Sequence, residues 1–510
     1  MILLLFLLYH CFLSIHCKYF PELDKVVQGR QYDPECVFNY TEINSKTIKK
    51  FPKCEHVYAI IVINNNTDLT VKELKTAFRQ MNALNGGVRI ENTTFQNISL
   101  FTPPKGDYEY VTFDVEYYGF IVRNNSDLID ANALWDVYLF FDGDLNEVEF
   151  RIENNPKLNT TILCAWGYID FYTEIIVQGN LEDCACNGGI MNPSSIPQFS
   201  TCEKVFSGVK LYNISDATDL SPLENVNTIR GTIDIRNTNL QNLSFFVGLE
   251  KLRMNSFNEN PKPCVNLFNN SQMTRLGIPN LKEISHWDPG NIKKANFERL
   301  HPEFCLTIEE IMFLLENLIS FSNLHAKVCI DNRTIVDEKV VCYFESMSML
   351  PENCQVLIGD LVINPGSEDH FPKLKSMIYL IGALAIQNTS LQHIEPLYTL
   401  RYIMQLDDSY PVIQIVGNKQ LAPPMFRHLE NIVTRKKRKA VIQDNDRFDY
   451  TSCVMFNDMD YPGPSYRKDL EISGYDCGER VGVQYRYPSG VHRHNNLFIH
   501  LIIMVLFFSS

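Results

Sequence analysis

Gly382-Ala-Leu-Ala-Ile386-Gln-Asn388-Thr389-Ser-Leu-Gln392 decides the fold of this chain, because two closely similar stretches precede it. They are Gly86-Gly-Val-Arg-Ile90-Glu-Asn92-Thr93-Thr-Phe-Gln96 and Gly231-Thr-Ile-Asp-Ile235-Arg-Asn237-Thr238-Asn-Leu-Gln241. The three stretches align without a gap at intervals of roughly 150 residues. Repetition at a fixed period indicates that one structural unit has been repeated. The sequence therefore predicts three tandem copies of one domain.

Short apolar strands alternate with turns inside each copy. A cysteine precedes a strand-like run in every copy: Cys54 before 57–63, Cys202 before 205–212 and Cys354 before 357–363. In the third copy, Ile363, Ile386 and Ile415 recur at the spacing of solenoid coils, about 20 to 30 residues. Such short, regularly interrupted strands do not suit an immunoglobulin sandwich. We predict a mainly β fold with short flanking helices, built as three tandem right-handed β-solenoids that resemble leucine-rich repeats.

Length and composition set the domain organisation. The 510 residues have room for three domains, and the net charge of −14 argues against a nucleic-acid partner, which needs a basic face. The apolar run Ile2–Leu8 predicts a secretory signal peptide, with a buried N-terminal strand as the alternative. The predicted parts are a signal peptide at 1–17, a degenerate first domain at 18–183, a second domain at 184–328, a third at 329–478 and a tail at 479–510.

The cysteines follow the same threefold register. One predicted bridge opens each copy and another closes it: Cys36–Cys54, Cys186–Cys202 and Cys342–Cys354, then Cys164–Cys184, Cys305–Cys329 and Cys453–Cys477. Cys184 and Cys186 are close enough in sequence to exchange partners. Cys264 is left over in this scheme, and we predict a buried free thiol there, with a disulfide to another chain as the alternative. The spacing favours structural disulfides over metal ligands.

Asn-x-Ser/Thr sequons are frequent in this chain and support a secretory route. The N-glycosylation candidates are Asn39, Asn65, Asn97, Asn124, Asn159, Asn213, Asn242, Asn269 and Asn332. Asn92, Asn237 and Asn388 occupy one position of the repeat, yet Asn237 is not in a sequon. Their shared role is therefore predicted to be a solenoid corner. We expect Asn92 and Asn388 to be poorly glycosylated, which mass spectrometry of the secreted protein can check.

A helix is predicted at 309–318, where apolar residues lie three and four positions apart. Thr307 and Glu310 have the spacing of a capping box. We expect this helix to cover the end of the second solenoid, which would otherwise expose apolar surface.

These motifs resemble a known family. The stretches Leu357-Ile-Gly359-Asp-Leu-Val-Ile363 and Ile381-Gly382-Ala-Leu-Ala-Ile386-Gln-Asn388-Thr389 are similar to the receptor L domain of insulin-receptor and epidermal-growth-factor-receptor ectodomains. His301-Pro302 and Phe304-Cys305 look like the secreted L-domain proteins of nematodes. The resemblance covers roughly residues 36–478 and implies a ligand-binding extracellular module. This chain departs from those receptors because its connectors are short and it has no kinase motif.

The resemblance implies an extracellular glycoprotein that binds an insulin-like or epidermal-growth-factor-like peptide, as a decoy or co-receptor. The alternative is a structural or adhesive matrix protein that associates with itself. Outward aromatic residues could form the ligand surface, and we single out Tyr117, Tyr118 and Tyr138. No catalytic residue, metal or cofactor is predicted, since Asp142-Gly-Asp144 is the nearest acidic pair and fits a turn.

The C-terminal region suggests a membrane anchor. The apolar stretch 497–508 is too short to span a bilayer as a helix, and it follows a polar spacer. This layout predicts a glycosylphosphatidylinositol signal with Ser489 as the attachment residue. A short membrane tail or a secreted end are the alternatives. The basic run Arg435–Lys439 fits a convertase site, a polysaccharide-binding segment or a solvated loop.

Overall fold

A computed structural model of the chain confirms the mainly β class. The structure describes residues 20, 22–28, 31–102, 111–115, 118–140, 149–165, 174–254, 263–286, 293–331, 333–407, 410–423, 426, 428–435, 438–449, 470–474 and 476. They belong to two compact units whose boundary runs within the second copy. The first unit is Met1–Ile235, Ser244–Cys264 and Ile278–Trp287, and the second is Arg236–Leu243, Val265–Gly277 and Asp288–Ser510.

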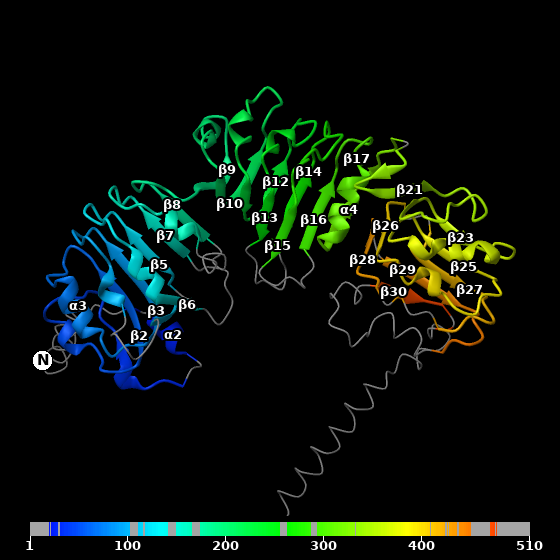
Figure 1. Cartoon of the computed structure of the whole chain (residues 1–510). Coiled ribbons are helices and arrows are strands. Elements are labelled where there is room, and N and C mark those ends of the chain that lie inside the picture. The colour runs from blue at the N-terminus through cyan, green and yellow to red at the C-terminus, as the bar shows by residue number, and fades with distance from the viewer. Residues whose placement is uncertain are drawn as a thin grey trace, which may run out of the picture. The chain divides into compact units, whose positions relative to one another are not determined.

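The first copy contains one sheet of parallel strands, shown in blue and cyan in Figure 1. Its strands are β1 (Val37–Phe38), β2 (His56–Ile63), β3 (Ala83–Glu91), β4 (Val111–Asp114), β5 (Phe120–Arg123), β6 (Val137–Phe140), β7 (Glu149–Glu153) and β8 (Glu174–Gln178). Strand β3 forks: Ala83–Asn85 pairs with β4, whereas Val88–Glu91 pairs with β5. The sheet therefore continues as two ladders, β4–β6 and β5–β7–β8.

The second copy repeats this arrangement around the long strand β10. The sheet order is β15-β13-β11-β10-β12-β14-β16-β18, and β9 pairs with β10. The strands are β9 (Cys186–Met191), β10 (Lys204–Tyr212), β11 (Thr228–Arg230), β12 (Ile233–Arg236), β13 (Lys251–Met254), β14 (Val265–Phe268), β15 (Glu283–His286), β16 (Lys293–Glu298) and β18 (Ile319–Leu324). A small parallel pair, β17 (Cys305–Leu306) and β19 (Lys327–Val328), lies outside this sheet.

The third copy has two separate sheets. One runs β20 (Ile335–Val336), β21 (Lys339–Tyr343), β22 (Val356–Ile358), β24 (Tyr379–Ile381), β26 (Tyr402–Gln405) and β28 (Asn431–Thr434). The other runs β23 (Leu361–Ile363), β25 (Leu384–Gln387), β27 (Ile413–Val416), β29 (Arg438–Gln443) and β30 (Leu470–Ser473). The strand-like run at 357–363 is thus divided between β22 and β23, which are separated at Gly359 and Asp360. In the basic run, Arg435 follows β28, and Arg438 and Lys439 are the first two residues of β29; Lys436 and Lys437 lie outside the described residues.

The repeated glycine is explained by close packing where the two ladders separate. A Cβ atom at Gly86 would overlap the carbonyl oxygen of Ala59, and one at Gly382 would overlap that of Gly359. Gly86 also has φ of +144°, which L side chains rarely adopt. Glycine at this position of the repeat therefore allows successive coils to approach each other.

A column of buried amides joins successive coils next to each corner. Asn125 is fully buried; its Oδ1 accepts bonds from the N–H and hydroxyl of Thr93, and its Nδ2 donates to the carbonyl of Ile90 and to Asn155. The columns are Thr93, Asn125, Asn155, Asn180 and Asp183 in the first copy, Thr238 and Asn270 in the second, and Thr389, Asn418, Asn445 and Asp476 in the third. Each column provides hydrogen-bond partners for buried backbone N–H and C=O groups of the turns.

The predicted corner residues lie just outside this column. Asn92, Asn237 and Asn388 are exposed and have left-handed backbones, with φ of 56°, 54° and 53°. Asparagine tolerates this region better than most residues. The amides that bond the turn are those of the buried column, such as Asn418, which donates to the carbonyl of Ile386. Glycan occupancy at Asn92 and Asn388 stays a prediction.

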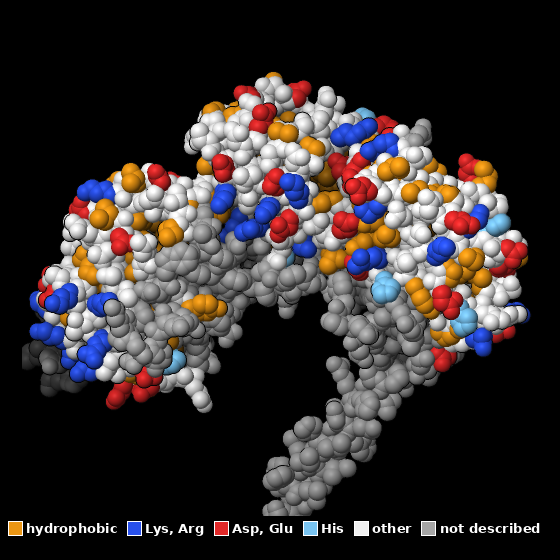
Figure 2. Space-filling model, in the orientation of Figure 1, with side chains coloured by type: hydrophobic (Ala, Val, Ile, Leu, Met, Phe, Trp, Pro, Cys, Tyr) orange, Lys and Arg blue, Asp and Glu red, His pale blue; other side chains and the backbone are white. Residues whose placement is uncertain are grey.

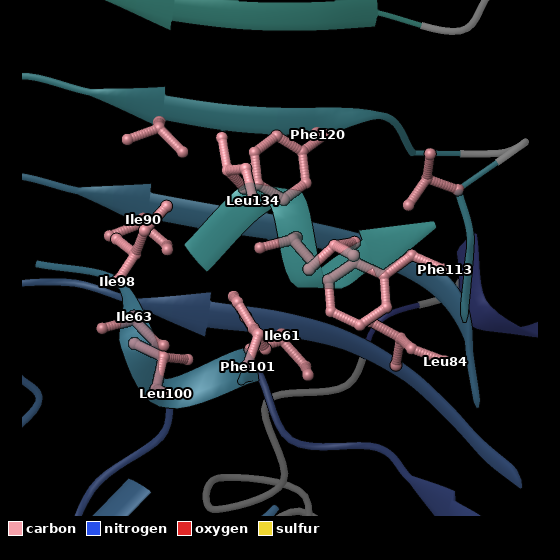
Figure 3. Packing of buried hydrophobic residues seen from close by; sticks show 14 of the residues in the cluster. Ile61, Ile63, Leu84, Ile90, Ile98, Leu100, Phe101, Phe113, Phe120 and Leu134 are labelled. Atoms are coloured by element: carbon pink, nitrogen blue, oxygen red, sulfur yellow. The ribbon is translucent and has the colours of Figure 1, made fainter. Parts of the chain in front are cut away.

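Aromatic and aliphatic side chains fill the first copy between its strands and its turns. Figure 3 shows Phe113, Phe101 and Leu84 packed close together, with Phe120 and Leu134 further along the same core. The rings of Phe101 and Phe113 meet edge to face with centroids 4.9 Å apart. Both side chains are at most 2% exposed, and the buried cluster that contains them extends to Phe206 on β10.

Three α-helices flank the sheets in the described part of the chain: α2 (Glu22–Val27), α3 (Val71–Ala77) and α4 (Ile308–Glu316). Capping boxes begin two of them. Thr70 pairs with Glu73 at α3, and the predicted pair Thr307 and Glu310 is confirmed at α4. Burial raises the pKa of Glu310 despite bonds from the N–H groups of Thr307 and Gly277.

Four predicted disulfides are present: Cys36–Cys54, Cys186–Cys202, Cys305–Cys329 and Cys342–Cys354. Cys184 is also disulfide-bonded, and Cys264 is completely buried. Several predictions fall outside the described residues, namely those on 1–17, Tyr117, Asp142, Asp144, the side chain of Cys164, Asn332, Cys453, Cys477 and the tail 479–510 with Ser489. Among the helices that the structure describes, none has the length and apolar character needed to cross a membrane.

Candidate ligand-binding surface

One sheet face of the second copy carries two rows of side chains, and each row contains two basic residues. Val205, Ile229 and Leu252 point into the core, so their strand neighbours point outward. The first outward row crosses β10, β11, β13 and β15 as Lys204, Thr228, Lys251 and Glu283. Parallel strands lie about 4.8 Å apart, which places these side chains close together.

The second row lies two residues further along the same strands. Arg230 on β11 is in register with Arg253 on β13 and Ser285 on β15. The guanidinium of Arg230 lies over the ring of Phe206, with its Cζ atom 5.7 Å from the ring centroid. Arg230 is only 1% exposed, whereas Arg253 is partly exposed. Cation–π stacking of this kind fixes a guanidinium in place.

The charge of this surface differs from that of the whole protein. Lys204, Arg230, Lys251 and Arg253 are grouped on adjacent strands, although the chain as a whole has a net charge of −14. At the edge, Lys282 donates a 2.7 Å bond to Glu250, and this bond lowers the pKa of Glu250. Figure 2 shows the gathering of Lys and Arg side chains over β10, β13 and β15. We call Lys204, Lys251 and Arg253 the cationic surface; Arg230 is buried beside them.

Like charges on neighbouring strands repel each other. Each such pair destabilises the sheet by about 0.2–1 kcal/mol, the usual size of a side-chain interaction between adjacent strands. An anion bound across the rows would reverse that effect. Carboxylates suit the arrangement, because arginine offers planar paired donors and lysine offers a mobile ammonium. The surface is therefore chemically suited to an acidic segment of a ligand.

The corresponding face of the third copy is already covered by the chain itself. Tyr379 and Tyr402 lie in one cross-strand row with Asn431, and their rings stack with centroids 5.0 Å apart. Helix α4 contacts β26 and β28, and Asn431 donates to the carbonyls of Leu315 and Ile319 at 3.2 and 3.3 Å. The helix predicted to cover the end of the second solenoid thus also packs on the third copy.

The tyrosines of this covered face are held by carboxylates. The hydroxyl of Tyr379 donates to Glu316 at the end of α4, and that of Tyr402 donates to Glu430 at 2.6 Å. Burial raises the pKa of both tyrosines, and the adjacent carboxylates raise it further. Tyr379 is 2% exposed and Tyr402 is 6% exposed. This face cannot receive a ligand unless α4 moves away.

Two of the tyrosines predicted as a ligand surface in the first copy, Tyr118 and Tyr138, are among the described residues. Tyr138 on β6 is 49% exposed and is in register with Thr112. Tyr118 is half-buried, with the Cζ atom of Arg89 4.9 Å from its ring centroid and the ring of Phe20 at 6.0 Å. Of these two residues, Tyr138 is the one that remains accessible enough for a direct ligand contact.

No group of three or more His, Cys, Asp or Glu residues suited to a metal occurs in the described part of the chain. The cationic surface was not among the features predicted from the sequence. Its signal was an alternation of basic residues with buried ones: Lys204 precedes Val205, Lys251 precedes Leu252, and Arg253 follows Leu252.

Comparison with known proteins finds a family that matches two stretches of the chain. The model of the receptor L domain matches residues 201–317 and 353–460, which are the second and third copies. A search of curated proteins found no match. Receptor L domains are extracellular, non-catalytic modules that bind ligands, and the disulfides described above agree with an extracellular chain. The second and third copies of this chain are therefore similar to the receptor L domain.

Proposed function

We propose that the chain is an extracellular glycoprotein of three tandem L-domain-like solenoids, 18–183, 184–328 and 329–478, which sequesters or presents a peptide ligand. The proposal extends the family match to the first copy because its sheet forks at β3 as the second sheet forks at β10. Insulin-like and epidermal-growth-factor-like peptides are the ligand classes that the family resemblance suggests. The ligand is held without chemical change, as a decoy or co-receptor would hold it.

The cationic surface is the observation that carries this proposal. It lies on a sheet face of the second copy, and two of its members, Lys204 and Lys251, are on the surface of the protein. The matching face of the third copy is occupied by α4. We therefore assign ligand contact to the second copy and infer that the ligand presents an acidic segment. Charge of one sign gathered on a face also accelerates encounter with an oppositely charged partner.

Charge reversal tests this assignment. Exposed ion pairs contribute up to about 1 kcal/mol each, and reversal replaces attraction with repulsion. The double variant Lys204→Glu/Lys251→Glu should therefore lose about 2 kcal/mol, or roughly 30-fold in affinity. Surface plasmon resonance with the immobilised full chain would measure this loss. The probes are insulin-like and epidermal-growth-factor-like peptides and a polyglutamate peptide.

Lys210→Glu is the matched control, because Lys210 is on the same strand, six residues beyond Lys204. It should change affinity less than twofold. The loss in the double variant should also shrink at high salt, since salt screens exposed charges. If a peptide bound saturably and its affinity were the same in the double variant, the ligand would bind elsewhere on the protein.

Alternatively, the same surface pairs with acidic residues of another molecule of this protein, which has a net charge of −14. This would make the chain an adhesive or structural matrix protein. Sedimentation of the full chain separates the two functions. Concentration-dependent assembly that the double reversal abolishes, without binding of any peptide probe, would favour self-association.

A further inference from the structure

Many sequons of this chain coincide with its turns. Five are left-handed corner residues that follow a strand, with φ between 53° and 57°: Asn92, Asn124, Asn213, Asn269 and Asn388. Three more stand two residues before a 3-10 helix: Asn97, Asn159 and Asn242. At Asn97 and Asn159 the sequon hydroxyl closes the turn, because Ser99 and Thr161 each donate to the asparagine side chain at 2.7 Å. Turn chemistry therefore accounts for these sequons even where no glycan is attached.

Two of the corner sequons lie on neighbouring coils. Strands β3 and β5 are in register up to the corner, with Ile90 opposite Val122 and Glu91 opposite Arg123. The next residues are Asn92 and Asn124, and the N–H of Asn92 donates to the carbonyl of Arg123 at 3.1 Å. Neighbouring strands are about 4.8 Å apart. Because both residues are exposed and share one backbone conformation, their amides leave the corner side by side.

The two corners cannot move apart without breaking the buried column behind them. Thr93 follows Asn92 and Asn125 follows Asn124 in sequence, and both Thr93 and Asn125 are buried. The N–H and hydroxyl of Thr93 donate to Oδ1 of Asn125 at 2.9 and 2.7 Å. A branched N-linked core is far wider than the strand spacing of about 4.8 Å. Glycans on both residues would therefore compete for one volume.

We propose that Asn92 and Asn124 form an exclusive glycosylation pair, so that the folded protein carries one N-glycan at this corner and never two. A chain modified at both positions would have to separate the corners to fold, which would leave Thr93 and Asn125 without their mutual bonds. Such molecules fail to close the first copy and stay inside the cell. The inference goes beyond the proposed ligand-binding function, because it needs only entry into the secretory pathway.

Removing each sequon through its hydroxyl leaves the left-handed asparagine in place. Thr94→Ala removes the sequon of Asn92, and Ser126→Ala removes that of Asn124; both hydroxyl residues are exposed. Occupancy is read by mass spectrometry on the secreted and the retained protein separately. Since Asn92 is expected to be poorly occupied, Ser126→Ala should raise occupancy at Asn92 several-fold in the secreted protein. The double variant should lose one glycan mass.

Ser215→Ala is the matched control, because it removes the corner sequon of Asn213 on another strand. It should leave occupancy at Asn92 and Asn124 unchanged. Doubly modified corners should be found only in the retained protein. Secreted molecules of the unsubstituted protein with glycans on both residues or on neither would overturn the proposal, as would a double variant that loses two glycan masses.

Discussion

Replacing Asn418 with leucine is expected to destabilise the third copy by about 3–5 kcal/mol. Asn418 is completely buried, and its Oδ1 accepts bonds from the N–H and hydroxyl of Thr389 at 2.9 and 2.7 Å. Its Nδ2 donates to the carbonyl of Ile386 and to Asn445. Leucine has a similar volume but fills none of these roles, so several buried polar groups would lose their partners. Each such group costs about 1–3 kcal/mol.

Hydrogen exchange measures this effect locally, which is necessary in a chain of several domains. Amides of β25, β27 and β29 should exchange faster in Asn418→Leu, while those of the first copy should not change. Asn353→Leu provides a matched control because Asn353 is exposed in the same copy. Unchanged protection of β25 and β27 would show that the amide column does not hold the coils together.

Replacing Phe113 with alanine should have a comparable cost in the first copy, about 3–5 kcal/mol. The side chain is fully buried on β4, and its ring meets Phe101 edge to face. Truncation removes that contact and leaves a cavity that the surrounding strands cannot fill (Figure 3). Urea unfolding followed by hydrogen exchange in β2, β3 and β5 should show early loss of this copy alone.

Phe245→Ala serves as its control, since Phe245 is half-buried and belongs to the second copy. It should cost much less than Phe113→Ala. If Phe113→Ala destabilised all three copies together, the first copy would not be an independent folding unit, and the proposed domain boundary at 183 would be wrong.

The repeat was enough to predict the mainly β class and the four described disulfides that match the expected pairs, because both depend on patterns that recur along the sequence. The repeat could not predict that α4 packs on the sheet of the third copy. The sequence showed its cap and its apolar spacing, but the contact between Asn431 and Leu315 joins residues 116 positions apart. Nothing local to Asn431 marks it as a residue that binds the end of a helix.

The cationic surface escaped prediction for a similar reason. Lys204, Thr228 and Lys251 are more than twenty positions apart in sequence and become neighbours only through strand register. The tyrosines of the first copy were predicted as the ligand surface instead, because several of them are clustered in sequence. Tyr118 is half-buried against Arg89 and Phe20, and only its strand environment reveals this.

The amide columns also have a direction. An asparagine side chain both accepts and donates hydrogen bonds. It can therefore continue the column to the next coil, as Asn155 does by donating to Asn180. A carboxylate only accepts, and Asn180 and Asn445 each donate to one, Asp183 and Asp476. In the first and third copies, the column therefore ends in a carboxylate, which has no hydrogen to donate to a further coil. Such a terminus would discourage separate molecules from joining end to end into filaments.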